Sequence, residues 1–234
     1  MAYRAVIYGC LVALDKQPGI HPVVVGETWI SLFDKYMLRV TGPEATSTCQ
    51  DDHIFPGLKA VTDGEVHGVQ DIWDTKSTTR DWGLIPVVSK NSFNKINLIG
   101  ILSIVCHLWT SGARFIFSCY RHWSLLVLRN WNGKSSFLHS REGLMQVEPL
   151  SMVAYGILVL LLIKNMEAGF PDVTQSWCAG DVSALGTFTR VKSYFNSLNQ
   201  HGPGRGYYPE PSKSVMITNP ENIEARFFWL MPSV

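Results

Sequence analysis

The sequence predicts one α/β (α+β) domain in which helices pack against a single, mainly antiparallel sheet. Short apolar segments of strand length alternate along the chain with longer segments whose apolar residues recur at helical spacing. The 234 residues are 46% hydrophobic and 17% charged, so the chain has enough apolar side chains for a core. This composition excludes an intrinsically disordered protein.

The first 90 residues contain a predicted strand, two helices and a second strand. The apolar run 6–14 is extended and ends at a Pro/Gly turn. Helices are expected over 27–39 and 64–75, with a polar loop at 41–56 between them. The short apolar run 82–88 predicts a buried strand that leads into the next helix. The apolar positions of the first helix are Trp29, Leu32, Phe33, Tyr36 and Met37.

Two further helical patterns and a hairpin occupy the middle of the chain. The helical patterns cover 91–109 and 113–123. Residues 125–129 and 135–139 are expected to pair as strands, because the Asn132-Gly133 dipeptide between them is a favoured hairpin turn.

The longest apolar run, Leu150 to Ile163, follows Pro149, which suits the first position of a helix. Its fourteen residues are fewer than the roughly 20 that cross a bilayer, so a buried core helix is expected here and no membrane partner. Beyond it, strands are predicted at 173–177 and 182–185 around a tight corner. A helix at 188–199 and a last strand at 215–218 complete the pattern.

Charge and cysteine content limit the classes of partner and compartment. Twenty basic and nineteen acidic residues give a net charge of +1, which predicts weak binding to RNA or DNA. The five cysteines are scattered and contain no CxxC pair, which favours a reducing compartment. The N-terminal apolar run lacks a convincing signal-peptide cleavage site. We therefore expect an intracellular protein, cytoplasmic or nuclear.

Five stretches carry a resemblance to a known family. In chain order they are LDKQPGIHPVVVGETW (14–29), VVSKNSFNKIN (87–97), REGLMQVEPLSMVAYG (141–156), WCAGDV (177–182) and EPSKSVMI (210–217). Together they resemble the fingers and palm of reverse transcriptases, the RNA-directed DNA polymerases, of non-LTR retroelements. The resemblance implies a polymerase-type fold with a fingers-like region at 1–80 and a palm-like region at 81–234. It also implies RNA or DNA as partners, and we expect the helical thumb of the family to be absent.

The resemblance also points to positions at which the chain departs from the family. Reverse transcriptases hold two Mg²⁺ ions with carboxylates, which activate the primer hydroxyl and neutralise the triphosphate. The first acid lies five residues before the aromatic matched by Phe93, and that position is Val88. The first acid of the aromatic-x-Asp-Asp hairpin corresponds to Gly180, so that only Asp181 survives of three acids. We therefore expect no bound Mg²⁺ and no polymerase activity.

The nucleotide-binding positions implied by the family match only in part. They are Lys16, His21, Phe93, Gln146 and Lys213. A histidine replaces an arginine at position 21, and neutral imidazole is a poor substitute for a bidentate guanidinium. Val147 follows Gln146 where the family has a glycine that lets the backbone approach template and nucleotide.

Plainer interpretations stay open beside these. Asp181 is better explained as a solvated turn residue than as a metal ligand, and Phe93 is equally well explained as an ordinary core aromatic. Glu148 precedes Pro149, where a carboxylate stabilises a helix N-terminus, and so is not expected to replace a missing metal ligand. For the whole chain, the alternatives to a degenerate polymerase are a domesticated RNA- or protein-binding module without enzymatic activity and a translated relic without function.

Overall fold

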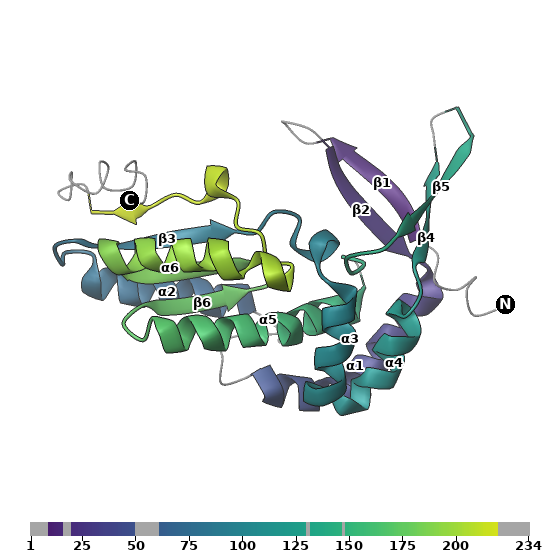
Figure 1. The fold of residues 1–234 in the computed structure, drawn as a ribbon, viewed down its shortest axis with the longest axis horizontal. Coiled ribbons are helices and arrows are strands. Elements are labelled where there is room, and N and C mark those ends of the chain that lie inside the picture. The colour runs from purple at the N-terminus through teal and green to yellow at the C-terminus, as the bar shows by residue number, and fades with distance from the viewer. Residues whose placement is uncertain (1–8, 16–19, 50–60, 130–131, 147, 220–234) are drawn as a thin grey trace. The chain divides into compact units, whose positions relative to one another are not determined.

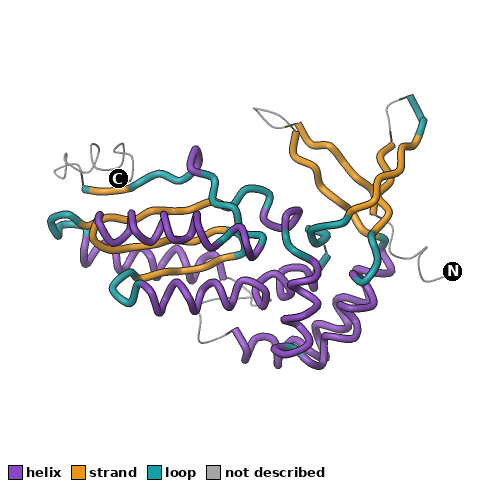
Figure 2. The backbone as a smooth tube through the Cα atoms, in the orientation of Figure 1, coloured by secondary structure: helices purple, strands orange, loops and turns teal. Residues whose placement is uncertain are grey.

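The computed structural model of the chain describes residues 9–15, 20–49, 61–129, 132–146 and 148–219. These residues form six α-helices and two four-stranded sheets (Figures 1 and 2). The predicted mixed α/β class is confirmed, although two sheets stand where one was expected. Strand pairing is mainly antiparallel, as predicted, with one parallel pair.

The chain divides into two compact units, and each unit is built from two separate stretches. Unit 1 comprises Met1–Cys49 and Asn91–Leu158, and unit 2 comprises Gln50–Lys90 and Val159–Val234. These units are defined by compactness alone. The division into fingers-like and palm-like regions at residue 80 does not coincide with either break and stays a prediction.

The sheet of unit 1 has the strand order β2-β1-β4-β5. A hairpin of β1 (Gly9–Asp15) and β2 (Ile20–Gly26) lies beside β4 (Ser124–Arg129), which runs parallel to β1. The predicted pairing of β4 with β5 (Ser135–Ser140) is confirmed, and Gly133 in their turn has a positive φ of 78°. One face of the sheet is buried in a small cluster of Val24, Leu126 and Met145, with Leu11 beside it.

The helices of unit 1 are α1 (Thr28–Cys49), α3 (Leu98–Leu108) and α4 (Thr110–Tyr120). The helix predicted over 91–109 is interrupted: a 3₁₀ turn, η3 (Ser92–Lys95), precedes Ile96, which has extended backbone. The α-helix proper begins after Asn97, whose side chain accepts a hydrogen bond from the Gly100 N–H at 3.0 Å. This N-cap explains the break that the apolar spacing did not predict.

The loop predicted at 41–56 is wrong for its first part, because α1 continues to Cys49; residues 50–56 lie outside the described part of the chain. The extra turns contain Pro43 and are held by neighbouring helices. Trp109 Nε1 donates to the Thr41 carbonyl at 3.0 Å, and Thr48 Oγ1 donates to the Leu108 carbonyl at 3.0 Å. These tertiary contacts outweigh the weak helix propensity of the segment.

The apolar spacing predicted the position of α1 but not the face that it buries. Ile30, Asp34, Thr41, Ala45 and Cys49 are the buried residues of the helix. Four of the five apolar positions recognised in the sequence are exposed, together with Val40 on the same side: Trp29 65%, Leu32 55%, Phe33 49%, Tyr36 67% and Val40 60%. Unit 1 therefore presents an apolar helix face to its surroundings.

The sheet of unit 2 is antiparallel throughout, with the order β6-β7-β3-β8. Its strands are β3 (Trp82–Val88), β6 (Thr174–Cys178), β7 (Asp181–Thr187) and β8 (Ile217–Thr218). In β3, Ile85 and Val87 are completely buried, whereas Pro86 and Val88 are only half-buried. Alternation along the strand therefore gives the sheet one core face and one more accessible face.

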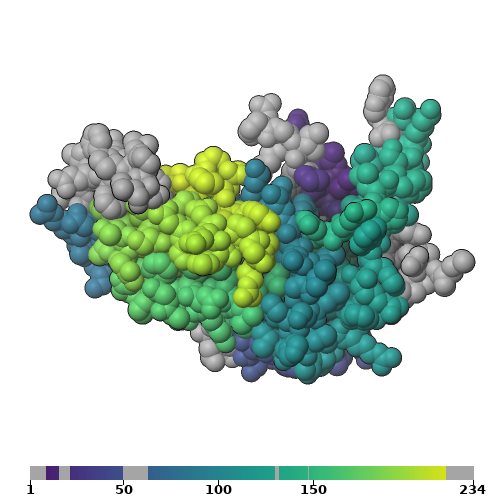
Figure 3. Space-filling view, in the orientation of Figure 1, coloured from purple at the N-terminus to yellow at the C-terminus, as the bar shows by residue number. Residues whose placement is uncertain are grey.

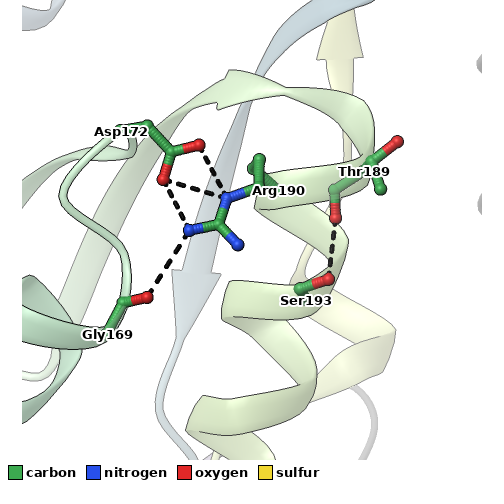
Figure 4. A network of polar contacts seen from close by, with 5 residues as sticks. All are labelled: Gly169, Asp172, Thr189, Arg190 and Ser193. Carbon is green, nitrogen blue, oxygen red and sulfur yellow. Dashed lines mark hydrogen bonds and ion pairs between the residues drawn. The ribbon is translucent and has the colours of Figure 1, made fainter.

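Helices α2 (Val61–Lys76) and α6 (Phe188–His201) pack against this sheet. Residues of α6 occupy much of the face of unit 2 that is turned to the viewer in the space-filling view (Figure 3). Near the start of α6, Arg190 binds Asp172 through two nitrogens at 2.6 Å and also reaches the Gly169 carbonyl (Figure 4). This fork-shaped pairing connects the end of α5 with the first turn of α6.

The helix α5 (Pro149–Gly169) carries no charged side chain before Lys164 and is almost completely buried over that length. It begins at Pro149 as predicted. Of the helices in the described residues, it is the one that is long and apolar enough to cross a membrane, and 72% of its most apolar window is buried inside the protein. That burial is what the core-helix interpretation of Leu150 to Ile163 predicts. The boundary between the two units falls within this helix, so α5 contributes Pro149–Leu158 to unit 1 and Val159–Gly169 to unit 2.

Candidate functional site

The candidate site in unit 2 lies where β3 ends beside the start of β7. In the antiparallel register of these strands, Val88 pairs directly with Asp181. Residues that are directly opposite in such a pair project from the same face of the sheet. This is the more accessible face, because Val88 is half-buried and Asp181 is exposed. The two positions that the sequence singled out are therefore neighbours.

The turn between β6 and β7 brings the third predicted position into the same place. Ala179 adopts the left-handed conformation with a φ of 51°, and Gly180 follows it. The Gly180 carbonyl accepts a hydrogen bond from the Ser89 N–H at 3.2 Å, one residue beyond Val88. Val88, Gly180 and Asp181 thus meet at one corner of the sheet, although the role of each stays a prediction.

A loop segment borders the other side of β3 at this end. The Lys90 N–H donates to the Tyr208 carbonyl at 2.7 Å, and the Glu210 N–H donates to the Val88 carbonyl at 2.8 Å. The loop is anchored by Tyr207, whose buried ring meets the Trp177 ring edge-on with centroids 5.3 Å apart. The side chain of Tyr207 therefore contributes to packing within unit 2.

Charges around the corner are balanced. Lys90 Nζ lies 3.5 Å from Glu210 Oε2, and Ser212 Oγ donates to Glu210 Oε1 at 2.9 Å. The Ser212 hydroxyl, followed by Lys90 and Lys213, lowers the pKa of the Glu210 carboxyl. For Asp181, partial desolvation raises the pKa, while the Ser89 N–H and the charge of Lys213 oppose the shift. Two acids and two lysines share the corner.

The residues at this corner do not fit a pair of divalent ions. Mg²⁺ prefers hard oxygen ligands in octahedral geometry, and neither Val88 nor Gly180 carries a side-chain oxygen. Glu210 already engages Lys90 and Ser212, and the lysines would repel a cation. Across the described residues, no group of three or more His, Cys, Asp or Glu side chains is placed to hold a metal ion. Sequence reasoning overlooked Glu210 as a neighbour, although it stands in the last family-like stretch.

The predicted nucleotide-binding residues are divided between the two units. Lys213 is exposed on the 3₁₀ turn η5 (Pro211–Lys213) of unit 2, near enough to influence Asp181. In unit 1, the Phe93 ring packs at a tilt of 35° against the buried Tyr155 ring, with centroids 4.9 Å apart, and Gln146 is half-buried. His21 lies in β2 opposite Leu14. Lys16 and Val147 lie outside the described residues.

Unit 1 also contains a cavity of about 190 Å³ that sequence reasoning did not find. Its lining comes from the sheet, including Leu11 and Val24, and from the loop that leads to Gln146. Asn91 and Asn94 add amide groups, and both lie in the family-like stretch 87–97. The two asparagines are the sequence feature that could have pointed to this cavity, but nothing in their spacing predicts one.

Comparisons with known proteins agree with this architecture. A telomerase of Candida tropicalis truncated from its C-terminal domain matches with a TM-score of 0.67 at 14% identity, over 92% of this chain and 51% of that chain. A telomerase of Candida albicans, solved with the TWJ fragment of telomeric RNA, matches with a TM-score of 0.67 at 9% identity, over 92% and 43%. The corresponding C. tropicalis complex gives a TM-score of 0.66 at 13% identity, over 91% and 41%.

These matches define the class of protein at the level of its fold. Telomerase is a reverse-transcriptase-related enzyme, and the chain has a reverse-transcriptase-like fold. It spans about half the length of the telomerase chains that it resembles. No protein-family model matches the sequence, and no curated protein matches it.

Proposed function

We propose that the chain is a reverse-transcriptase-like domain of non-LTR retroelement descent that has lost RNA-directed DNA synthesis. Its origin is inferred from the five family-like stretches and their order. An intracellular location, cytoplasmic or nuclear, follows from the scattered cysteines. The telomerases with a similar fold are seen with RNA, which supports a nucleic acid as the ancestral partner.

One observation carries the proposal of lost activity. Val88 is paired with Asp181 at the corner where the family's first and second acids would meet, and Gly180 occupies the turn beside them. A polymerase depends on metal ions to stabilise the charge that develops on the transferred phosphate. Rate enhancements of this kind require on the order of 10 kcal/mol or more of barrier reduction. Asp181 alone of the three family acids, with Glu210 already bound to Lys90, cannot supply the ion binding on which this reduction depends.

The test compares the natural chain with two double variants. Val88→Asp with Gly180→Asp restores both acids, and Val88→Asn with Gly180→Asn introduces side chains of the same shape without charge. Mn²⁺ is titrated as a paramagnetic substitute for Mg²⁺ and followed by electron paramagnetic resonance, with circular dichroism as the check on folding. We expect a new Mn²⁺ site in the aspartate variant, with a Kd below about 1 mM, and none in the natural chain or the asparagine variant.

Primer extension gives the second readout. With an RNA template, a DNA primer and either Mg²⁺ or Mn²⁺, the natural chain is expected to add no nucleotides. Measurable extension by the natural chain would overturn the proposed inactivity. A folded aspartate variant that gains no Mn²⁺ site would instead show that positions 88 and 180 do not correspond to the family's acids.

A further inference from the structure

Two acidic side chains are buried against each other inside unit 1, whereas the corner of Val88 and Asp181 belongs to unit 2. Asp34 of α1 and Glu148, immediately before α5, are each only 3% exposed. Their carboxyl groups are hydrogen-bonded to each other. A hydrogen bond between two carboxyl groups requires that one of them carries a proton, because a carboxylate oxygen only accepts.

The remaining polar contacts of the pair hold its geometry. Ser31 Oγ, one turn before Asp34 on α1, donates to Glu148 Oε2 at 3.1 Å. The backbone N–H of Leu150, in the first turn of α5, donates to the Asp34 carboxyl group. The pair therefore connects two helices whose contributing residues lie more than a hundred positions apart in the chain.

The surroundings of the pair contain no compensating cation. The titratable groups that face the pair from the neighbouring α4 are Cys119 and Tyr120. Burial raises the pKa of the Tyr120 phenol above its ordinary value. Among the described residues, no positive charge acts on either carboxyl group. A charge buried without a partner is costly, and a carboxyl group in that position becomes neutral by keeping its proton.

A metal ion is a poor alternative to a proton at this place. Glu148 Oε1 is buried without a hydrogen-bond partner and lies against the Cα of Gly26, where even a Cβ atom would collide with it. The cavity beside Asp34 has a volume of only about 10 Å³, roughly that of one water. There is no room for the coordination shell of a divalent cation.

We propose that Asp34 and Glu148 form a proton-binding carboxyl pair that fastens α1 to the start of α5, and that this fastening is lost as the pH rises to neutrality. Burial, followed by the charge of Glu148, raises the pKa of Asp34 to about 7. Burial also raises the pKa of Glu148, against the hydrogen bond from Ser31. Above neutral pH both groups are ionised and repel each other at close range.

The direction of the pH dependence follows from proton linkage. In the unfolded chain Asp34 has its ordinary pKa of 3.8, so between about pH 4 and pH 7 the folded state binds one more proton than the unfolded state. The pair makes its full contribution to the free energy of unfolding below about pH 4, and this contribution declines as the pH rises to about 7. At its steepest, one linked proton changes the unfolding equilibrium constant about tenfold per pH unit.

The first experiment observes the proton directly in the natural full-length chain. Carboxyl ¹³C shifts of labelled Asp and Glu are followed by NMR between pH 3 and pH 9. We expect one carboxyl group to titrate near pH 7 and its signal to disappear in the Asp34→Asn variant. Asp172→Asn, which removes an exposed carboxyl group in unit 2, is the control and leaves that titration unchanged. The proposal is overturned if every carboxyl group in the natural chain titrates below about pH 5.

The second experiment measures urea unfolding at pH 5 and pH 7. Asn in place of Asp34 and Gln in place of Glu148 keep the shape and a hydrogen bond but remove the titration. The unfolding equilibrium constant of the natural chain should increase between these pH values by tenfold or more relative to the Asp34→Asn, Glu148→Gln double variant. An equal pH dependence in the two proteins contradicts the proposal. The NMR titration decides the question independently if the double variant does not fold.

Discussion

Gly143 illustrates how a single residue fixes local structure in unit 1. Its φ of +84° lies in the left-handed region, and a Cβ atom there would come within 2.6 Å of the Asn94 carbonyl oxygen. The Gly143 N–H also donates to the Ile96 carbonyl at 2.9 Å. The loop that carries Gln146 is therefore held against the segment that carries Phe93 by a contact that only glycine permits.

We predict that Gly143→Ala lowers the free energy of unfolding by about 2 to 4 kcal/mol, from left-handed strain and the collision with Asn94. Gly133→Ala is the matched control, since Gly133 has a similar φ of +78° but no atom within 4 Å of the added Cβ. The control should cost only about 1 to 2 kcal/mol. Urea unfolding of the two variants measures the difference, and equal losses would show that the contact with Asn94 is unimportant.

Residue-level chemistry was predictable only where a family pattern supplied it. The stretches around Val88 and Gly180 directed attention to one corner, and the structure brings these residues together with Asp181. The pairing of Asp34 with Glu148 had no such signal. Asp34 lies among apolar residues of an amphipathic helix, and Glu148 was assigned to a helix N-terminus, so neither position indicated a buried partner.

Some individual strands and helices were predictable from their own apolar runs. The strand at 82–88 has the predicted bounds, and the apolar run after Pro149 forms the buried helix α5. Helix α1 was predicted too short, and its apolar spacing did not identify the face that lies in the core. Its length and orientation depend on contacts with α3 and α4, such as the hydrogen bond from Trp109 to Thr41, which no local pattern contains.

Glu44 provides a second tertiary contact between α1 and α4, because its side chain caps the N-terminus of α4. Its Oε1 accepts from the N–H and hydroxyl of Thr110 at 3.1 and 3.0 Å, and its Oε2 accepts from the N–H of Ser111 at 3.1 Å and from the Ser111 hydroxyl. The hydrogen bond of the Ser111 side chain, followed by that of Thr110, lowers the pKa of the Glu44 carboxyl. The carboxylate thus satisfies N–H groups that a helix start leaves unpaired.

We predict that Glu44→Gln lowers the melting temperature at pH 7, because an amide nitrogen cannot accept the hydrogen bonds from Ser111. A carboxyl group with a lowered pKa stabilises the fold above its ordinary pKa and loses that effect as the pH falls. The difference in melting temperature between the two proteins should therefore shrink between pH 5 and pH 3, as measured by circular dichroism. Glu142→Gln, at an exposed position in the same unit, should change little at either pH. A difference that does not depend on pH would argue against the cap.

At the scale of the whole molecule, charge sets the expectation for nucleic acid. The net charge of +1 gives little electrostatic attraction to a polyanion. We predict that a 20-nucleotide single-stranded RNA binds in a filter assay at 50 mM salt with a Kd weaker than about 1 µM. A submicromolar Kd that weakens steeply with added salt would favour the alternative of a domesticated RNA-binding module.

The mixed fold class was predictable from the alternation of strand and helix patterns, but the number of sheets was not. Strand pairing between distant segments, such as β1 with β4, depends on the complete chain. Local spacing records which segments are strands and gives no information on which sheet they join. The division into two units could not be predicted from sequence patterns either, because each unit joins segments that lie far apart in the chain.

The interleaving of the two units has a consequence for synthesis on the ribosome. Each unit begins in the first 90 residues and is completed only by residues from the second half of the chain. The usual order, in which an N-terminal domain folds before the next one emerges, is therefore not open to this protein. Until α5 leaves the exit tunnel, both cores lack a part of their apolar lining, and the nascent chain exposes apolar surface that the finished fold buries.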